Sequence, residues 1–577
     1  FISYLAPYES RLNVYIQKLD SDDDPIQITY ATDRDIAGYF WANDSRIVYI
    51  KDQAGDENFH LFAVDINGNN PIKLTPFANV KVTLIDDLED SEAEIIIGMN
   101  QRNEQIFDAY RINVYTGETK LIGENPGNIS DWMTDNDGKL RIAVTSDGVN
   151  TSLLYRKKEE EPFQNILTTN FKETLTPLFF SFDNQFIYAA TNIGRDKTSI
   201  VSFDLDLVKE KELIFEHTEV DVSGLLRSKK RKKITGAVAY THRRQYKFFD
   251  EDRKKLQDKL ESLLPDYEVV VSHSNKDEDK ILVRTFSDKS RGAYHFYNRN
   301  TEEIKKLSEI SPWLNEPELC DMKPIQYTSR DGLTIHGYLT LPKNKEPKNI
   351  PMIINPHGGP WVRDFWGFNP EVQFLANRGY GILQMNYRGS IGYGRKFWEL
   401  SFKQWGAAMQ NDITDGVNWL IDQGIADSEK IAIYGGSYGG YAVLAGLAFT
   451  PDLYTCGIDY VGVSNIFTLL ETLPPYWELG RQMMYEMIGD PEKDEELLRK
   501  ASPVFHADQI KAPLLVAQGA NDPRVKKSES DQIVEALKSR NIDVPYIVKD
   551  NEGHGFRNEE NRFEFYRAME KFLEKHM

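Results

Sequence analysis

The chain of 577 residues has only two cysteines, Cys320 and Cys456, and they lie far apart. This scarcity excludes a disulfide-rich scaffold and a cysteine-based metal centre. Because Cys456 begins an apolar stretch, we expect it to be buried in a core. No apolar run approaches the roughly 18 residues that a membrane-spanning helix needs. No motif calls for a cofactor or a metal ion.

Positive charge is also in short supply, since 69 Lys and Arg stand against 89 Asp and Glu, a formal net charge of -20. This balance disfavours nucleic acid and anionic membranes as partners. One basic run, residues 227–233, is typical of a solvated loop between strands. The chain begins with Phe1 rather than Met, so we expect a trimmed N-terminus. Cytoplasmic, periplasmic and secreted locations all stay open, as does homo-oligomerisation.

The length is too great for one hydrophobic core, so we expect at least two domains. Up to about residue 310, short β-branched and aromatic runs alternate with clusters of Asn, Asp, Gly and Lys. A short apolar strand recurs at a spacing of roughly 45 to 48 residues, which suits a four-stranded propeller blade. Each repeat carries an isoleucine: Ile2, Ile47, Ile95, Ile142, Ile187, Ile234 and Ile281. The pattern predicts an N-terminal seven-bladed β-propeller over residues 1–310, with an irregular pair of β-sandwiches as the alternative.

From about Pro324 onward, strands alternate with helices, as in a mostly parallel sheet. The expected strands are residues 352–354, 381–386, 430–434, 456–461, 514–517 and 546–548. We predict an α/β-hydrolase domain over residues 324–577. Residues 311–323, which include Pro312 and Pro317, form the predicted linker.

A serine between glycines follows one of these strands. Ser437 lies in Gly-Gly-Ser-Tyr-Gly-Gly, between an apolar run and a helical pattern. An α/β-hydrolase presents its nucleophile at such a turn, which is too tight for side chains beside the serine. The motif by itself is weak, so the assignment of Ser437 depends on its partners.

A nucleophilic serine needs a base, and the base needs an acid that orients it. In α/β-hydrolases the chain order is Ser, acid, His. After Ser437 only His506, His554 and His576 remain, and His554 has a glycine on each side, just before the last helix. We predict His554 as the base. Asp522, directly after the strand at 514–517, is the predicted acid, and Asp459 is the runner-up.

Two main-chain N–H groups should bind the oxyanion of the tetrahedral intermediate. One belongs to Tyr438, the residue after the nucleophile. The other should come from the His-Gly-Gly-Pro segment that follows the strand at 352–354. We assign Gly359, with Gly358 as the second choice. His357 is expected to shape this loop rather than to act as a base.

These segments resemble the prolyl oligopeptidase family of serine peptidases, in particular its acylaminoacyl-peptidase-like branch, which includes bacterial dipeptidyl peptidases. The similar segments are residues 357–360, 386–390, 392–394, 435–441, 518–525 and 553–556. The resemblance implies a propeller that caps the hydrolase and admits only short peptides. It also implies that Arg524 binds a substrate carbonyl. The S1 pocket should be apolar, favour an apolar P1 side chain and draw on Val463, Leu473, Tyr476 and Trp477.

The predicted function is therefore a serine peptidase that hydrolyses short peptides through an acyl-enzyme. No convincing paired-glutamate motif is present, so dipeptidyl peptidase, acylaminoacyl-peptidase and oligopeptidase activities all stay open. A carboxylic-ester hydrolase is the alternative, because the same triad cleaves esters. A non-enzymatic propeller scaffold is disfavoured by the complete triad.

Overall fold

The computed structural model describes residues 1–577 except 20–22, 53–57, 475–476, 478–479 and 543. The predicted S1 residue Tyr476 lies outside the described residues. The chain divides into two compact units, residues 1–189 with 201–212 and residues 190–200 with 213–577. The second unit therefore combines the last two N-terminal sheets with the whole predicted hydrolase region. The domain boundaries at 310 and 324 stay a prediction.

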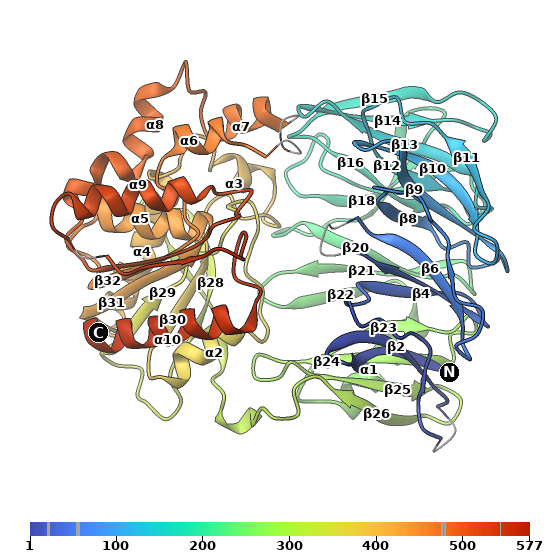
Figure 1. Cartoon of the computed structure of the whole chain (residues 1–577), viewed down its shortest axis with the longest axis horizontal. Coiled ribbons are helices and arrows are strands. Elements are labelled where there is room, and N and C mark those ends of the chain that lie inside the picture. Colours follow the sequence, from blue (N-terminus) through green and yellow to red (C-terminus); the bar gives the residue numbers. More distant parts are fainter. Residues whose placement is uncertain (20–22, 53–57, 475–476, 478–479, 543) are drawn as a thin grey trace. The chain divides into compact units, whose positions relative to one another are not determined.

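Seven antiparallel sheets follow one another in the N-terminal region, and they form the seven-bladed β-propeller that the repeat predicts (Figure 1). In each sheet the strands lie in sequence order, so each blade is a local unit of the chain. The first five sheets consist of β1 (Ile2–Tyr8), β2 (Arg11–Gln17), β3 (Ile26–Gln27); β4 (Gly38–Asn43), β5 (Arg46–Lys51), β6 (His60–Asp65), β7 (Ile72–Lys73); β8 (Val82–Asp86), β9 (Glu94–Asn103), β10 (Ile106–Asn113), β11 (Thr119–Gly123); β12 (Ile129–Thr134), β13 (Leu140–Ser146), β14 (Asn150–Tyr155), β15 (Gln164–Asn170); and β16 (Leu175–Phe180), β17 (Ile187–Thr191), β18 (Ser199–Asp204), β19 (Lys209–Phe215). The last two consist of β20 (Val222–Ser228), β21 (Lys233–Tyr240), β22 (Arg244–Phe248); and β23 (Glu268–Ser274), β24 (Lys280–Phe286), β25 (Ala293–Asn298), β26 (Glu303–Glu309).

The seven recurring isoleucines fall on seven different sheets. Ile2 lies on β1, and the other six lie on the second strand of their sheets. Most of them are fully buried; for example, Ile47, Ile95 and Ile142 are each 0% exposed. The repeat was visible in the sequence because most of the sheets bury an isoleucine on their second strand.

A helix in the N-terminal region, α1 (Glu251–Leu263), was not predicted. It begins at Asp250, whose side chain accepts a hydrogen bond from the main-chain N–H of Arg253. The buried Leu260 packs into a cluster with Val269 and Ile281 of the last blade. The same Asp250 forms ion pairs with Arg231 and Lys233, both at 2.9 Å. The basic run thus lies at the turn between β20 and β21, as predicted.

The C-terminal region contains an eight-stranded sheet in the order β27-β28-β30-β29-β31-β32-β33-β34. β28 pairs antiparallel with β27 and β30, and the remaining pairs are parallel. All the expected strands are present, which confirms the α/β-hydrolase prediction. The strands are β27 (Met322–Thr328), β28 (Thr334–Thr340), β29 (Ile350–Ile354), β30 (Gly381–Asn386), β31 (Ala426–Gly436), β32 (Cys456–Tyr460), β33 (Leu514–Gly519) and β34 (Tyr546–Lys549).

Helices cover both faces of this sheet (Figure 1). Alternate residues of one strand belong to different cores, since Ile354 packs with residues of α4, α5 and α9, and Ile353 with residues of α2 and α10. The two buried cysteines are free and lie in the second core, as expected for Cys456. The helices are α2 (Pro370–Asn377), α3 (Arg395–Glu399), α4 (Ala408–Asp422), α5 (Tyr438–Phe449), α6 (Ile466–Glu471), α7 (Arg481–Met487), α8 (Glu495–Ala501), α9 (Lys527–Lys538) and α10 (Glu559–His576).

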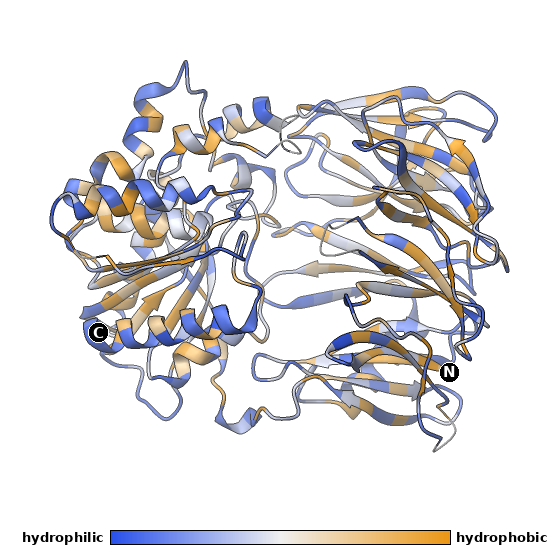
Figure 2. Ribbon diagram, in the orientation of Figure 1, coloured by the Kyte–Doolittle hydropathy of each residue, from blue (hydrophilic) through white to orange (hydrophobic). Residues whose placement is uncertain are grey.

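The central helix α5 differs from its neighbours because residues 438–448 are all buried. Figure 2 shows it and the adjoining strands as predominantly hydrophobic, whereas α10 alternates between hydrophobic and hydrophilic residues. A helix that is apolar on every side belongs in the interior. The residue at its N-terminus is therefore held by the core of the domain.

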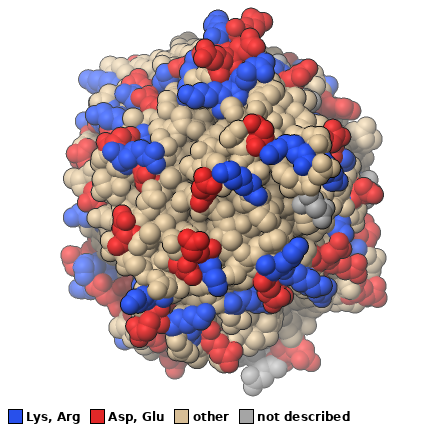
Figure 3. Space-filling view, turned by 90° about the vertical axis from the view of Figure 1, so that its left-hand side faces the viewer, with Lys and Arg blue, Asp and Glu red and all other residues tan. Residues whose placement is uncertain are grey.

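One face of the molecule carries mixed charge. Figure 3 shows Lys and Arg interspersed with Asp and Glu, so the face drawn there has no broad field of one sign. Among the described residues, no helix combines the length and the apolarity that crossing a bilayer requires.

Candidate active site

Ser437 lies at the turn between β31 and α5 and has φ 60° and ψ -120°, a conformation that is unfavourable for a residue with a side chain. The neighbouring glycines are required by close packing. A Cβ at Gly435 would lie 2.7 Å from the main chain of Gly439, and one at Gly439 would lie 2.3 Å from the carbonyl oxygen of Pro356. The turn is therefore as tight as the sequence motif predicts.

The predicted oxyanion loop lies directly against this turn. It follows β29, and a Cβ at Gly358 would lie 3.5 Å from the Cβ of Ser437. Gly359 has φ 116°, a backbone conformation that favours glycine. Tyr438 opens α5, so its main-chain N–H is not used by a hydrogen bond within the helix. Both predicted oxyanion donors thus belong to segments that meet at Ser437.

His357 shapes the oxyanion loop. Its Nδ1 lies 2.7 Å from the carbonyl oxygen of Gly358, and its Nε2 lies 2.9 Å from Oγ of Ser390. The ring stacks on Tyr387 with centroids 4.4 Å apart. Burial lowers the pKa of His357 to about 4, so the imidazole is neutral at pH 7.

The segment of residues 386–390 packs against this loop and holds it by a hydrogen bond. The hydroxyl of Tyr387 donates to the carbonyl oxygen of His357 at 2.8 Å. The buried Arg388 donates to both oxygens of Asp412, at 2.7 and 2.8 Å. A bidentate pair of this kind has a fixed geometry. It therefore fixes the backbone that carries Tyr387.

The predicted acid and base are in direct contact. Oδ2 of Asp522 lies 2.7 Å from Nδ1 of His554. Oδ1 of Asp522 accepts hydrogen bonds from the main-chain N–H groups of Arg524 and Val525, at 2.9 and 3.0 Å. The carboxylate is fully buried and the imidazole is 18% exposed. Asp522 can therefore hold one tautomer of His554 while the other ring nitrogen stays accessible.

The loop that carries His554 is braced by Glu552, a residue that the sequence analysis missed. Its carboxylate accepts hydrogen bonds from the main-chain N–H groups of Arg557 and Asn558, both at 2.9 Å, and from Nδ2 of Asn561 at 2.7 Å. Burial alone would raise the pKa of Glu552, but these donors outweigh it and lower the pKa. The only signal in the sequence was an acidic residue just before Gly-His-Gly.

The runner-up acid, Asp459, lies next to the first turn of α5. It is fully buried on β32, and a Cβ at Gly440 would lie 2.4 Å from its Oδ1. Burial raises the pKa of Asp459 to about 7, although the main-chain N–H of Gly462 opposes the shift. Asp459 thus packs beneath the first turn of α5, whereas Asp522 binds His554.

The remaining predicted site residues differ in their exposure to solvent. Arg524 is exposed on the turn directly after Asp522. Val463 and Leu473 are buried, at 2% and 7% exposure, and Val463 belongs to the main core. Trp477 is half-buried. Of the described S1 candidates, Trp477 is the most exposed.

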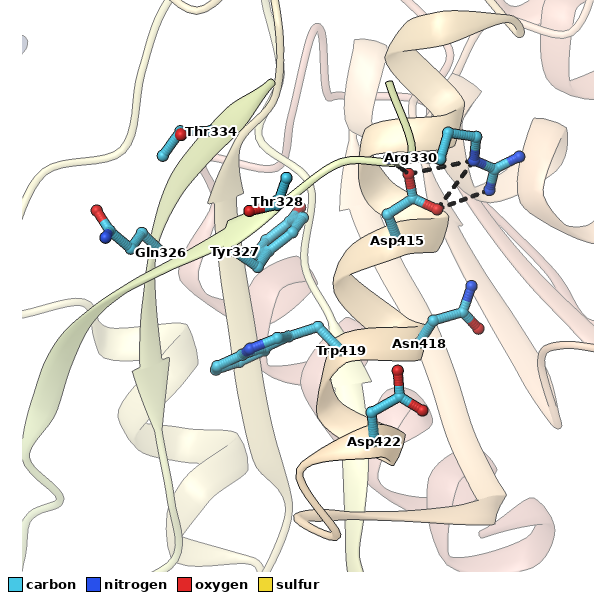
Figure 4. A pocket seen from close by; sticks show the side chains of 9 residues that line it. All are labelled: Gln326, Tyr327, Thr328, Arg330, Thr334, Asp415, Asn418, Trp419 and Asp422. Atoms are coloured by element: carbon cyan, nitrogen blue, oxygen red, sulfur yellow. Dashed lines mark hydrogen bonds and ion pairs between the residues drawn. The ribbon is translucent and has the colours of Figure 1, made fainter. Parts of the chain in front are cut away.

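A separate cavity of about 460 Å³ lies between β27 and α4 (Figure 4). Its lining includes Trp419 and the ion pair of Arg330 with Asp415, whose closest atoms are 2.7 Å apart. None of the predicted site residues lines it. Among the described residues, no cluster of His, Cys, Asp and Glu is arranged to hold a metal ion.

Comparison with known proteins relates this geometry to a family. The sequence profile of the prolyl oligopeptidase family matches residues 366–577. The chain is 35% identical to dipeptidyl aminopeptidase BIII of Pseudoxanthomonas mexicana, over 99% of this chain and 85% of the relative. It is 30% identical to dipeptidyl peptidase family member 6 of Caenorhabditis elegans, over 99% of this chain and 83% of the relative.

Among solved structures, a puromycin-hydrolyzing peptidase of Mycobacterium tuberculosis superposes with a TM-score of 0.76. The match covers 98% of this chain and 91% of that one at 18% identity. This likeness concerns the fold, and it extends through both the N-terminal sheets and the C-terminal α/β region.

Proposed function

Since the chain belongs to the prolyl oligopeptidase family of serine peptidases, we propose that Ser437, His554 and Asp522 are the residues with which it hydrolyses peptide bonds. The observation that carries this assignment is the 2.7 Å contact between Asp522 and His554. It joins an acid and a base that follow the tight turn at Ser437 in the expected chain order.

Acylation begins at Ser437. Nε2 of His554 accepts the proton from Oγ of Ser437 as the oxygen attacks the substrate carbonyl carbon. Asp522 accepts the hydrogen bond from Nδ1–H and stabilises the imidazolium that forms. His554 then gives the proton to the departing amine, and the acyl group stays on Ser437. Water, activated by the same histidine, releases the acid product.

Negative charge develops on the carbonyl oxygen during both steps. The main-chain N–H groups of Tyr438 and Gly359 bind this oxyanion, with Gly358 as the alternative donor. Because β31, α5 and the support under His357 fix the two segments, these donors need little reorganisation as charge develops.

Release of dipeptides from free N-termini is the cleavage mode that we propose first. Two relatives that match nearly the whole chain are named dipeptidyl aminopeptidase BIII and dipeptidyl peptidase family member 6. Removal of blocked N-terminal residues and internal cleavage are the alternatives that an assay must distinguish. A carboxylic-ester hydrolase is not favoured, because these full-length relatives are peptidases.

Short peptides with an apolar P1 residue are the proposed substrates. The chain combines the propeller and hydrolase folds on which this family's size restriction depends. Arg524 is exposed close to Asp522, where it can bind a substrate carbonyl. The half-buried Trp477 would supply apolar S1 surface, with the buried Val463 packed in the core.

A matched set of three peptides tests both the residues and the cleavage mode. One sequence is supplied with a free amine, with an N-acetyl group, and as the centre of a longer internally quenched peptide. We expect dipeptide release from the free-amine form and a fall of at least about a thousandfold in Ser437→Ala. Equal turnover by Ser437→Ala would overturn the site, whereas preference for the acetylated form would establish acylaminoacyl-peptidase activity instead.

A further inference from the structure

Tyr460 is the last residue of β32, and its main chain holds the nucleophile turn. It pairs in parallel with Gly436, and its carbonyl oxygen accepts a hydrogen bond from the N–H of Ser437 at 2.9 Å. A Cβ at Gly436 would lie 3.5 Å from Cδ1 of the Tyr460 ring. The ring therefore stands beside the residue that precedes the nucleophile.

The other end of the Tyr460 side chain reaches the loop of the base. Its hydroxyl oxygen accepts a hydrogen bond from the main-chain N–H of Phe556, two residues after His554. A Cβ at Gly555 would lie 3.4 Å from the same hydroxyl. One side chain thus spans from the nucleophile strand to the loop of the base.

This side chain is itself rigidly held. Its ring stacks on Phe565 of α10 with centroids 4.7 Å apart and meets Phe556 edge-on at 5.2 Å. Burial raises the pKa of Tyr460 to about 12, so the phenol stays protonated at physiological pH. By contrast, His554 lies between two glycines, whose backbone has many accessible conformations. A fixed acceptor next to such a loop limits where the imidazole can lie.

We propose that Tyr460 is a positioning residue that sets the distance between Ser437 and His554. The proposal rests on the triad assignment given above and adds a residue to it. Tyr460 touches neither the substrate nor the transferred proton. It acts through His554, because the hydrogen bond to Phe556 anchors the C-terminal side of that loop. Proton transfer is sensitive to displacements below 1 Å, so a loosened loop slows the chemical step more than substrate binding.

The substitution Tyr460→Phe tests this role, because it keeps the ring and removes the acceptor. We expect kcat for a dipeptide-releasing substrate to fall about tenfold, as for the loss of one hydrogen bond that orders a reacting group, with KM nearly unchanged. The matched control is Tyr434→Phe on the neighbouring strand β31. The Tyr434 hydroxyl donates to Glu371 at 3.0 Å, and its ring lies in the same core near Phe565. This control should retain kcat within about twofold.

A double-mutant cycle with His554→Ala distinguishes positioning from a general structural role. If Tyr460 acts through His554, then Tyr460→Phe causes no further loss in the residual activity of His554→Ala. An equal tenfold loss in both backgrounds, or unchanged kcat in the single variant, would overturn the proposal. The cycle remains decisive even if Tyr460→Phe lowers the melting temperature.

Failure of the triad assignment would look different. In that case His554→Ala and wild type would react with a fluorophosphonate at the same rate at Ser437. If His554→Ala is slow and Tyr460→Phe matches wild type, only the role of Tyr460 is refuted.

Discussion

The turn that carries Ser437 and the loop that carries His554 belong to one proposed site, but different forces hold them. The turn is fixed by backbone contacts: glycines at 435 and 439 lie too close to their neighbours for any side chain, and α5 behind them is buried on all sides. The loop is fixed by polar side chains, chiefly Glu552 and Asp522, together with the Tyr460 hydroxyl. The nucleophile side should therefore be sensitive to added volume, and the base side to removed charge.

The largest expected effect comes from Asp522→Asn, which breaks the base side. The amide cannot keep the tautomer of His554 or stabilise its cation, so kcat should fall by about 10³ to 10⁴ with the fold retained. Peptide turnover and a thermal melt measure the two quantities. Asp452→Asn is the control, because Asp452 pairs with Lys511 on the surface. A loss below about tenfold for Asp522→Asn would contradict the assigned role.

Gly439→Ala tests the nucleophile side. The added methyl group would lie 2.3 Å from the carbonyl oxygen of Pro356, so the oxyanion loop must move. We expect kcat to fall about a hundredfold and stability to fall by about 1–3 kcal/mol. Gly224→Ala is the control, since a Cβ there would meet nothing within 4 Å. Wild-type kcat in Gly439→Ala would show that the turn tolerates volume.

Glu552→Gln should have a smaller effect, about tenfold on kcat, because the amide oxygen still accepts one of the loop hydrogen bonds. The lowered pKa of Glu552 means that its carboxylate stabilises the fold above the ordinary value of 4.5, and that this stability is lost as pH falls through the folded-state pKa. Melting temperatures of wild type and variant should therefore converge in acid. Glu560→Gln, an exposed change on α10, is the control. A constant difference at all pH values would contradict this account.

The smallest effect on activity is expected at Asp459, where the prediction concerns stability alone. Asp459 keeps its proton up to about pH 7 in the folded protein, whereas the unfolded chain loses it near 3.8. The free energy of unfolding must therefore fall as pH rises between these values. Asp459→Asn should remove the part of this pH dependence that Asp459 causes. The free energy of unfolding of the variant, relative to that of wild type, should therefore rise by on the order of 2 kcal/mol from pH 5 to pH 8. Denaturant midpoints at each pH measure this difference. If the free energies of unfolding of wild type and variant change in parallel with pH, the prediction is contradicted. Burial also raises the pKa of Asp364 to about 7. The free energy of unfolding of the variant should therefore still fall somewhat as pH rises.

The sequence predicted the parts of the molecule whose signals are local. The strand at 381–386, the turn at Ser437 and the order of Asp522 before His554 are all visible as short patterns. Tyr460 and Glu552 were missed, because their roles depend on the approach of segments that are distant in the chain or on hydrogen bonds to the main chain. α1 was missed because strand-like runs on both sides of it dominated the pattern. Val463 was predicted to line the pocket because it is apolar, and the structure places it in the core. An apolar residue suits either place, so the sequence alone could not distinguish them.

Because residues 438–448 of α5 are all buried, the geometry at Ser437 should persist as long as the domain stays folded. Amide protons in such a helix exchange with solvent only when the surrounding layers separate. The geometry at Ser437 should therefore not fray gradually with heat or denaturant. It should persist in each molecule until the C-terminal fold opens cooperatively, so that the fraction of labelled serine reports the fraction of folded protein.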